Sequence, residues 1–316
     1  MKATDIIKVL IVSVSCYFIT ACTDDDKVGV LPDITPIVME SEGGERVIDV
    51  GYENFIITHI VNKTGGNNTY IFGEIYSPDG NLIRENVPLS LEGTGRIESV
   101  WSDQGFRIVR DELSRLKVTV MEKSRPEEFN FSIVIKSGDE TKEINIQQKE
   151  SQGYTFDKIE YSLKPDDKDL LYTVKGTTYQ LNISSQEFKF SPFGGIDIIK
   201  RQYFGSDEPN AFVWTQDAPP AVEIPRDIYD GKIYYDSEKG VYDTRIVTKP
   251  HDYEGVEETI LIPEGGVEFY VDLEFHYRTV SYSLTLINNR TKEPKVIEGK
   301  WIETAPTGKY TIVKTE

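Results

Sequence analysis

Short runs of alternating apolar and polar residues, separated by turn residues, make up most of the chain. Residues 116–120 (LKVTV) and 129–135 (FNFSIVI) are examples from the first half. Such alternation turns one face of a β-strand toward a core and the other toward solvent. Turn sequences such as SPDG at residues 77–80 end individual runs. The pattern predicts an all-β fold built from antiparallel strands.

The second half has a similar pattern with longer strands. Residues 269–275 (FYVDLEF) and 279–287 alternate, and Asn288-Asn289 predicts a turn before a further strand near Val296. The polar stretch 147–153 ends at a glycine and has the composition of a linker. We therefore expect two immunoglobulin-like β-sandwich domains, at residues 37–150 and 153–316. Whether the second is one sandwich or two small units is left open by the pattern.

The N-terminus has the pattern of an export signal. Residues 9–19 (VLIVSVSCYFI) are apolar, but the run is shorter than the roughly 20 residues that span a bilayer. It fits the hydrophobic region of a signal peptide covering residues 1–21. The following FITAC sequence resembles a bacterial lipobox, which implies cleavage before Cys22 and lipidation of its thiolate. An ordinary signal peptide with a cysteine near its end is the alternative.

An acidic block follows the cysteine directly. Asp24, Asp25 and Asp26 could be a solvated spacer. They also resemble the export signal of surface lipoproteins from Bacteroides-type bacteria, which implies an outer-membrane protein that faces the cell exterior. Residues 22–36 contain prolines and no periodicity, so we expect an acidic tether.

Residues 33–150 show a second resemblance. The sequence EGGERVIDV at residues 42–50, Trp101, and the closing pattern from residue 116 to INIQQ at residues 144–148 resemble a BACON-like domain. The stretches 64–96 and 122–128 depart from that family. The resemblance implies carbohydrate binding, or a role as a spacer that carries another module. At the C-terminal end, Gly299, Trp301 and the PTGKYTI sequence at residues 306–312 resemble the last hairpin of β-sandwich modules in Bacteroides-type lipoproteins.

Composition narrows the function further. The chain has 316 residues and a net charge of -18, from 35 basic and 53 acidic residues, which disfavours nucleic acid as a partner. A hydrophobic fraction of 38% is enough to build cores. Only two cysteines and three scattered histidines, His59, His251 and His276, could serve as thiolate or imidazole ligands, so no metal site is expected.

No motif for catalysis stands out, and we expect no enzyme activity and no cofactor. The sequence has no nucleophile elbow, phosphate-binding loop or dinucleotide-binding loop. Asp166, Asp167 and Asp169 could supply paired carboxylates for glycoside hydrolysis, but such neighbours arise by chance among so many acidic residues. Residues 227–231 (DIYDG) fit only half of a calcium loop.

The most suggestive segment is residues 203–253, where aromatic residues lie among acidic residues, prolines and glycines without strand periodicity. Exposed rings stack on sugars and are enriched at interfaces, although they can also close the ends of a sandwich core. The candidate ligand-binding residues are Trp214, Tyr229, Tyr234, Tyr235 and Tyr242. For Trp214 a core position is the competing interpretation.

Together these features predict a non-catalytic cell-surface lipoprotein that binds carbohydrate or spaces a binding module from the outer membrane. The alternative is a structural or adhesive protein that binds another protein. The expected partners are the membrane, through the lipid anchor, and a glycan or neighbouring surface proteins.

Replacing Cys22 by serine tests the anchor. We expect the Cys22→Ser chain to lose labelling by a fatty-acid analogue and to accumulate as unprocessed precursor, because a hydroxyl does not replace the thiolate as the acceptor. Labelling in cells, followed by electrophoresis, measures both effects. Persistent labelling of the variant would contradict the assignment.

Overall fold

The computed structural model describes most of the chain after residue 30. The described residues are 31–182, 186–195, 199–250, 253 and 255–315. The predicted signal peptide, the lipidation site Cys22, the acidic residues Asp24, Asp25 and Asp26, and His251 lie outside them. No helix among the described residues is long and apolar enough to cross a membrane.

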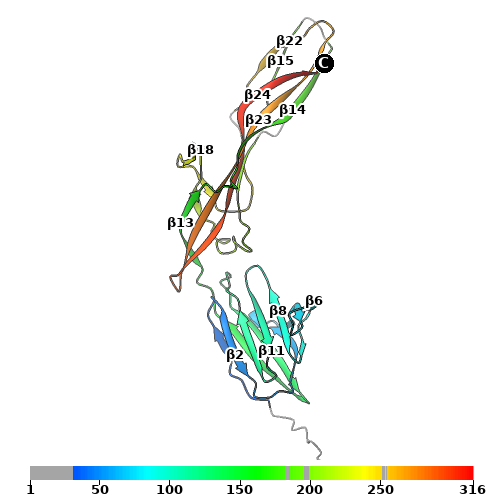
Figure 1. Cartoon of the computed structure of the whole chain (residues 1–316), viewed down its shortest axis with the longest axis vertical. Coiled ribbons are helices and arrows are strands. Elements are labelled where there is room, and N and C mark those ends of the chain that lie inside the picture. Colours follow the sequence, from blue (N-terminus) through cyan, green and yellow to red (C-terminus); the bar gives the residue numbers. More distant parts are fainter. Residues whose placement is uncertain (1–30, 183–185, 196–198, 251–252, 254, 316) are drawn as a thin grey trace, which may run out of the picture.

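The structure confirms the all-β class. The one helical element in the described part of the chain is a 3₁₀ turn, η1 (Thr64–Gly66). The strands form two groups that lie end to end along the molecule, with separate cores (Figure 1). We call them the first and the second domain.

The first domain is a sandwich of two six-stranded sheets. One sheet has the order β1-β12-β11-β3-β4, with β7 also paired to β3. Its strands are β1 (Ile37–Met39), β12 (Glu140–Gln148), β11 (Phe129–Ser137), β3 (Ile56–Asn62), β4 (Thr69–Tyr70) and β7 (Leu91–Glu92). The second sheet, in its order, consists of β2 (Gly44–Asp49), β10 (Arg115–Val120), β9 (Gly105–Arg110), β8 (Gly95–Val100), β5 (Phe72–Tyr76) and β6 (Leu82–Pro88).

Alternation in the sequence places the core of the first domain. Phe131, Ile133 and Ile135 of β11 point into it, together with residues of β9 and β10 in the facing sheet. The Gly-Gly turn is sterically required, because a Cβ on Gly43 would lie 2.1 Å from the carbonyl oxygen of Val120. Trp101 is 39% exposed and meets Phe129 edge-on at 5.8 Å, so it belongs to the rim of this core.

The second domain is organised around one long hairpin. Two 22-residue strands, β23 (Val267–Asn288) and β24 (Pro294–Thr315), pair along most of their length, and we call this pair the ribbon. The sequence predicted shorter separate strands in both places, and the structure joins them. The turn predicted at Asn288-Asn289 is confirmed.

Shorter strands flank the ribbon. Along its edges run β13 (Tyr154–Ser162), β14 (Asp169–Leu181) and β16 (Ile199–Gly205), and β21 (Val247–Pro250) pairs with the outer edge of β16. β13 and β14 follow one another along the same strand, β23, with a gap at residues 163–168. The two-stranded sheets are β15 (Glu187–Phe190) with β22 (Glu258–Leu261), β17 (Ala221–Glu223) with β20 (Lys239–Val241), and β18 (Asp227–Tyr229) with β19 (Lys232–Tyr234).

The ribbon carries two cores rather than one. Phe269, Val271 and Leu273 of β23 belong to the core at the far end of the domain, which we call the tip core. Val280 and Tyr282 belong to the core nearer the first domain, which we call the junction-side core. The buried positions change from odd to even numbers along a continuous strand. Because successive side chains point to opposite faces, the two cores lie on opposite faces of the ribbon.

Buried charges occupy the ribbon between the cores. Glu303 is fully buried and accepts a hydrogen bond from Arg278 Nε at 3.0 Å, while Lys200 Nζ lies 2.6 Å from its other oxygen. A buried carboxylate without partners would be strongly unfavourable, so the fold requires the Arg278 and Lys200 cations beside Glu303.

Close packing explains the GxW sequence near the C-terminus. Trp301 is fully buried in the junction-side core. Gly299 lies against the Tyr282 hydroxyl and the backbone of Gly205, where a Cβ would come within 2.5 Å and 2.2 Å of their oxygens. The ring of Tyr282 can therefore cross the ribbon only above a glycine.

Substituting Gly299 by alanine should destabilise the second domain. The added methyl group has no space, and overpacking of this kind costs about 1–3 kcal/mol. Gly205→Ala is the matched control, since its nearest neighbour would be 3.6 Å away. Urea unfolding measures both changes. Equal stability of the two variants would contradict this account.

Candidate functional site

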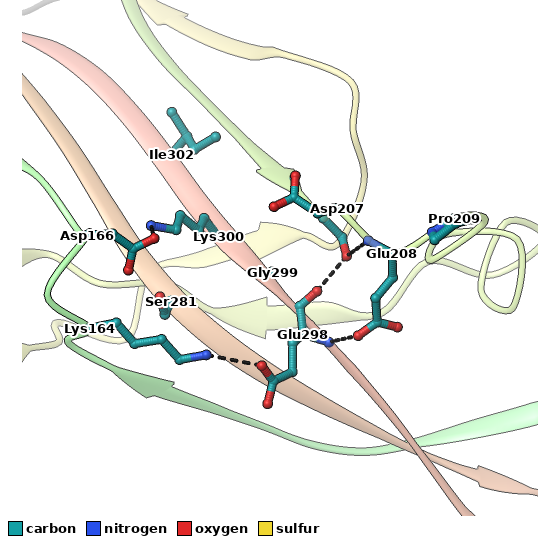
Figure 2. A pocket seen from close by; sticks show the side chains of 12 residues that line it. Lys164, Asp166, Asp207, Glu208, Pro209, Ser281, Glu298, Gly299, Lys300 and Ile302 are labelled. Atoms are coloured by element: carbon teal, nitrogen blue, oxygen red, sulfur yellow. Dashed lines mark hydrogen bonds and ion pairs between the residues drawn. The ribbon is translucent and has the colours of Figure 1, made fainter.

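A cleft of about 700 Å³ opens on the second domain, on the ribbon face opposite the junction-side core (Figure 2). Ser281 and Lys300 lie on this face because their neighbours Val280 and Trp301 point into the core. The loop at residues 163–168 forms one wall, and residues 205–209, after β16, form the other.

Acidic and basic side chains pair within this cleft. Lys164 Nζ lies 3.0 Å from Glu298 Oε2, and Lys300 Nζ lies 2.5 Å from Asp166 Oδ2. The hydrogen bond from Lys300 lowers the pKa of Asp166 below its ordinary value. Glu208 Oε1 accepts a hydrogen bond from the backbone N–H of Glu298 at 2.8 Å. The cleft therefore offers donors and acceptors to a polar ligand, but none of the lining residues that the structure describes is aromatic.

Asp167 fastens the loop to the ribbon. Its Oδ2 accepts hydrogen bonds from the backbone N–H groups of Ser281 (3.0 Å) and Lys164 (2.8 Å), and its Oδ1 accepts one from Ser281 Oγ (3.1 Å). Burial by itself would raise the pKa of Asp167, but these hydrogen bonds outweigh burial and lower it. The carboxylate replaces the strand partner that β23 lacks between β13 and β14.

The other carboxylates considered for chemistry also have structural partners. Asp169 pairs with His276 on the ribbon. Asp227 Oδ1 lies 3.2 Å from Arg278 Nη1, and Asp230 and Gly231 adopt φ angles of 49° and 66° at the turn between β18 and β19. The DIYDG sequence is thus a tight hairpin turn rather than a calcium loop. Within the described ranges, no group of three or more His, Cys, Asp or Glu side chains could hold a metal ion.

The β18–β19 hairpin exposes aromatic side chains. Tyr229 is 72% exposed and Tyr234 is 41% exposed, and the strand register places them on the same face. Ile228 and Ile233 on the other face pack against the junction-side core. Tyr235, also 41% exposed, follows β19 directly, and its ring lies 6.1 Å from that of Tyr161. The structure therefore brings two of the five predicted ligand-binding residues, Tyr229 and Tyr234, together on one face of a hairpin.

Tyr242 does not belong to this surface, which corrects the sequence-based assignment. It is 1% exposed, its ring stacks on Phe212 at 4.9 Å, and its hydroxyl lies 3.1 Å from that of Tyr282. Burial raises the pKa of Tyr242 to about 12. The strand before it, β20, is too short to reveal in the sequence which side chains turn inward.

Trp214 is also placed differently: it packs against the junction-side core, in line with the competing interpretation, beside the contact between the two domains. It is half-buried and meets Tyr154 edge-on at 5.4 Å, and Lys295 Nζ lies 4.0 Å above its ring. A face already occupied by an ammonium group is not free to stack on a sugar. The Tyr154 hydroxyl in turn hydrogen-bonds to Glu122 of the first domain.

Ion pairs complete this contact, which we call the junction. Glu42 Oε2 lies 2.6 Å from Arg290 Nη2, and Glu122 Oε2 lies 2.6 Å from Lys295 Nζ. Asn288 Nδ2 donates to Glu42 Oε1 at 2.9 Å. Partial burial favours a higher pKa for Glu42, but the hydrogen bonds from Arg290 and Asn288 outweigh it, so the pKa is lowered. Sequence reasoning missed these pairs, because partners 248 and 173 residues apart leave no local pattern.

Comparison with known proteins adds little. No protein-family model matches the chain, and no curated protein matches it. Among solved structures the chain is similar to a lamprey immune protein, with 12% sequence identity and a TM-score of 0.31, over 87% of this chain and 98% of that one. A similarity this weak carries no argument about function. The resemblance to BACON-like domains and to Bacteroides-type lipoproteins stays a prediction.

Neutralising the junction carboxylates should loosen the two domains. We expect Glu42→Gln combined with Glu122→Gln to broaden the distance distribution between spin labels placed on each domain, because both ion pairs are lost. Glu45→Gln is the control, since Glu45 pairs with Lys117 inside the first domain at 3.2 Å. An unchanged distribution in the double variant would show that the ion pairs do not hold the domains.

The same contact should weaken in acid. The folded-state pKa of Glu42 lies below its ordinary value of 4.5. Its contribution is therefore complete above pH 4.5 and is lost as the pH falls through the lower, folded-state pKa. The label distances, measured from pH 7 downward, should broaden only in that acidic range.

Proposed function

We propose that this chain is a non-catalytic lipoprotein of the bacterial cell surface. A lipid on Cys22 holds it to the outer membrane, and Asp24, Asp25 and Asp26 direct it to the exterior. The apolar run, the FITAC sequence and the acidic block support this proposal. The many carboxylates at the cleft and junction serve ion pairs and backbone hydrogen bonds, which fits a binding or structural role better than catalysis.

In this proposal the first domain is a spacer. The N–H of Leu31 bonds to Glu140 beside the β11–β12 turn, at 2.9 Å, whereas the linker to the second domain follows the opposite end of β12. The described chain thus enters the first domain at one end and leaves at the other. The second domain continues in the same direction, with the C-terminus near its far tip (Figure 1). A protein anchored through residue 22 would hold its second domain well above the membrane.

The second domain would bind carbohydrate through the β18–β19 hairpin. The observation that carries this proposal is the pair of exposed rings, Tyr229 and Tyr234, on one face of a hairpin that projects from the ribbon (Figure 1). Lys232 shares that face and could bond to sugar hydroxyls. Rings that bind the C–H face of a sugar beside polar groups are typical of such sites.

The alternative is a structural or adhesive protein that binds another protein. It is favoured by a different observation, the unpaired outer edge of β14, on which exposed apolar side chains lie.

Glycan binding by the chain from residue 28 onward tests the first proposal. We expect Tyr229→Ala combined with Tyr234→Ala to weaken binding more than tenfold, because losing a stacked aromatic costs about 1–3 kcal/mol by analogy with base stacking. The control is Tyr70→Ala, a substitution at a 57% exposed tyrosine of the first domain. A glycan array followed by calorimetry gives the affinities. Failure of the unsubstituted chain to bind any glycan would remove the carbohydrate proposal.

A further inference from the structure

The outer edge of β14 is a strand edge without a partner. β14 pairs with β23 on one side, and no other strand in the described part of the chain pairs with it. The N–H of Thr279 donates to the carbonyl of Lys168 at 2.8 Å, so the pair 168/279 is hydrogen-bonded. Hydrogen-bonded pairs alternate along an antiparallel ladder. The backbone N–H and C=O groups of Asp169, Leu171, Thr173 and Lys175 therefore point away from β23, toward solvent.

This edge lacks the usual protection against strand pairing. Leu170, Leu171 and Tyr172 are 51%, 58% and 41% exposed, and no charge or proline lies between Asp169 and Lys175. Natural edge strands are commonly guarded by such residues, or by bulges. Here a bulge follows Lys175 and the loop at residues 163–168 precedes Asp169, so the open edge covers residues 169–175.

We propose that this edge pairs with the same edge of a second copy, in antiparallel orientation. Residues whose backbone groups point outward must lie opposite residues of the same kind in the second copy. The strands can therefore pair only in registers in which one residue, the centre of the pair, lies opposite the same residue of the other copy. Centring on Tyr172 places Asp169 opposite Lys175 at both ends and Leu171 opposite Thr173. Centring on Thr173 leaves Asp169 opposite Thr177 and Lys175 opposite Leu171. Centring on Leu171 leaves Asp169 opposite Thr173 and moves Lys175 past the open edge to Asp167, whose carboxylate is already bound by Ser281 and Lys164.

Charge complementarity therefore selects one register out of those the backbone allows. Asp169 and Lys175 also lie on the same face of the strand, so each can reach its counterpart across the pair. Asp169 would then share its carboxylate between His276 and the second copy, and the Lys175 ammonium would leave the Tyr270 ring that it covers in the single chain. Leu170 would come to lie opposite Val174 and cover apolar surface that is open to solvent in the single chain.

The pairing has a consequence for orientation. β14 runs along the long axis of the second domain (Figure 1), so antiparallel pairing points the N-terminal ends of the two copies in opposite directions. If each copy is anchored through Cys22, which rests on the proposed function, the two anchors belong to two facing membranes. The strand pairing itself does not depend on the anchor.

Single cysteines on β14 test the register. The sequence contains two cysteines, Cys16 and Cys22, so the chain from residue 28 onward has none of its own. In Tyr172→Cys the two thiols face each other as a non-hydrogen-bonded pair, close enough for a disulfide. We expect this variant to form covalent dimers in a glutathione buffer much faster than Leu171→Cys or Thr173→Cys. Equal rates for the three variants, or no dimer from Tyr172→Cys, would overturn the proposal.

Charge reversal tests the same pairing without a cysteine and keeps the apolar side chains. Asp169→Lys and Lys175→Asp should each weaken self-association in sedimentation by about tenfold, because both symmetry-related pairs become repulsive. The double variant should restore it, and Lys158→Asp on β13 should leave it unchanged. Circular dichroism confirms that each variant is folded. A double variant that stays as weak as the single ones would exclude this register.

Cells that display the lipidated chain separate the two parts of the inference. Clumping that Asp169→Lys abolishes and the double variant restores would support pairing between membranes. Cross-linking of Tyr172→Cys without any clumping would overturn the bridging of membranes and leave the strand pairing in place. A chain that stays monomeric and uncross-linked would overturn self-pairing and leave the edge to a strand from another protein.

Discussion

The pairing of β23 with β24 is the constraint on which the second domain depends. These two strands contribute residues to both cores, and they supply Arg278 and Glu303 of the buried ion pair and the floor of the cleft. A strand that is buried on one face at one end and on the opposite face at the other cannot slip by one residue, because both cores would be turned outward together. The change of buried face therefore strengthens the register of the hairpin.

The buried ion pair lies where the core changes face. Neither side of the ribbon is fully apolar there, and Arg278, Glu303 and Lys200 fill the space with paired charge. Breaking such a pair leaves an unpaired charge in a buried site, which commonly destabilises a protein strongly. This arrangement also separates the tip, with β14, from the half of the domain that meets the first domain.

Most charged groups around the second domain are held by other groups of the protein. Asp167 binds backbone N–H groups, Asp169 pairs with His276, and Glu42 and Glu122 pair with cations across the junction. What remains open is a set of surfaces: a polar cleft, a hairpin with exposed tyrosines, and a bare strand edge. Surfaces of these kinds suit binding, and the end-to-end order of the domains would present them at a distance from an anchored N-terminus (Figure 1).

The sequence by itself determined the all-β class, the turn after Asn288 and the alternation in β11, because each depends on neighbouring residues only. It also found the segment that contains the exposed hairpin. It did not distinguish Tyr242 from Tyr229, since both lie on short strands or loops whose facing depends on distant contacts. The two cores, the packing of Trp214 against one of them and the pairing of Glu42 with Arg290 were decided by the tertiary structure alone. Each of these requires residues far apart in the chain to meet, and no local pattern of apolar and polar residues records such a meeting.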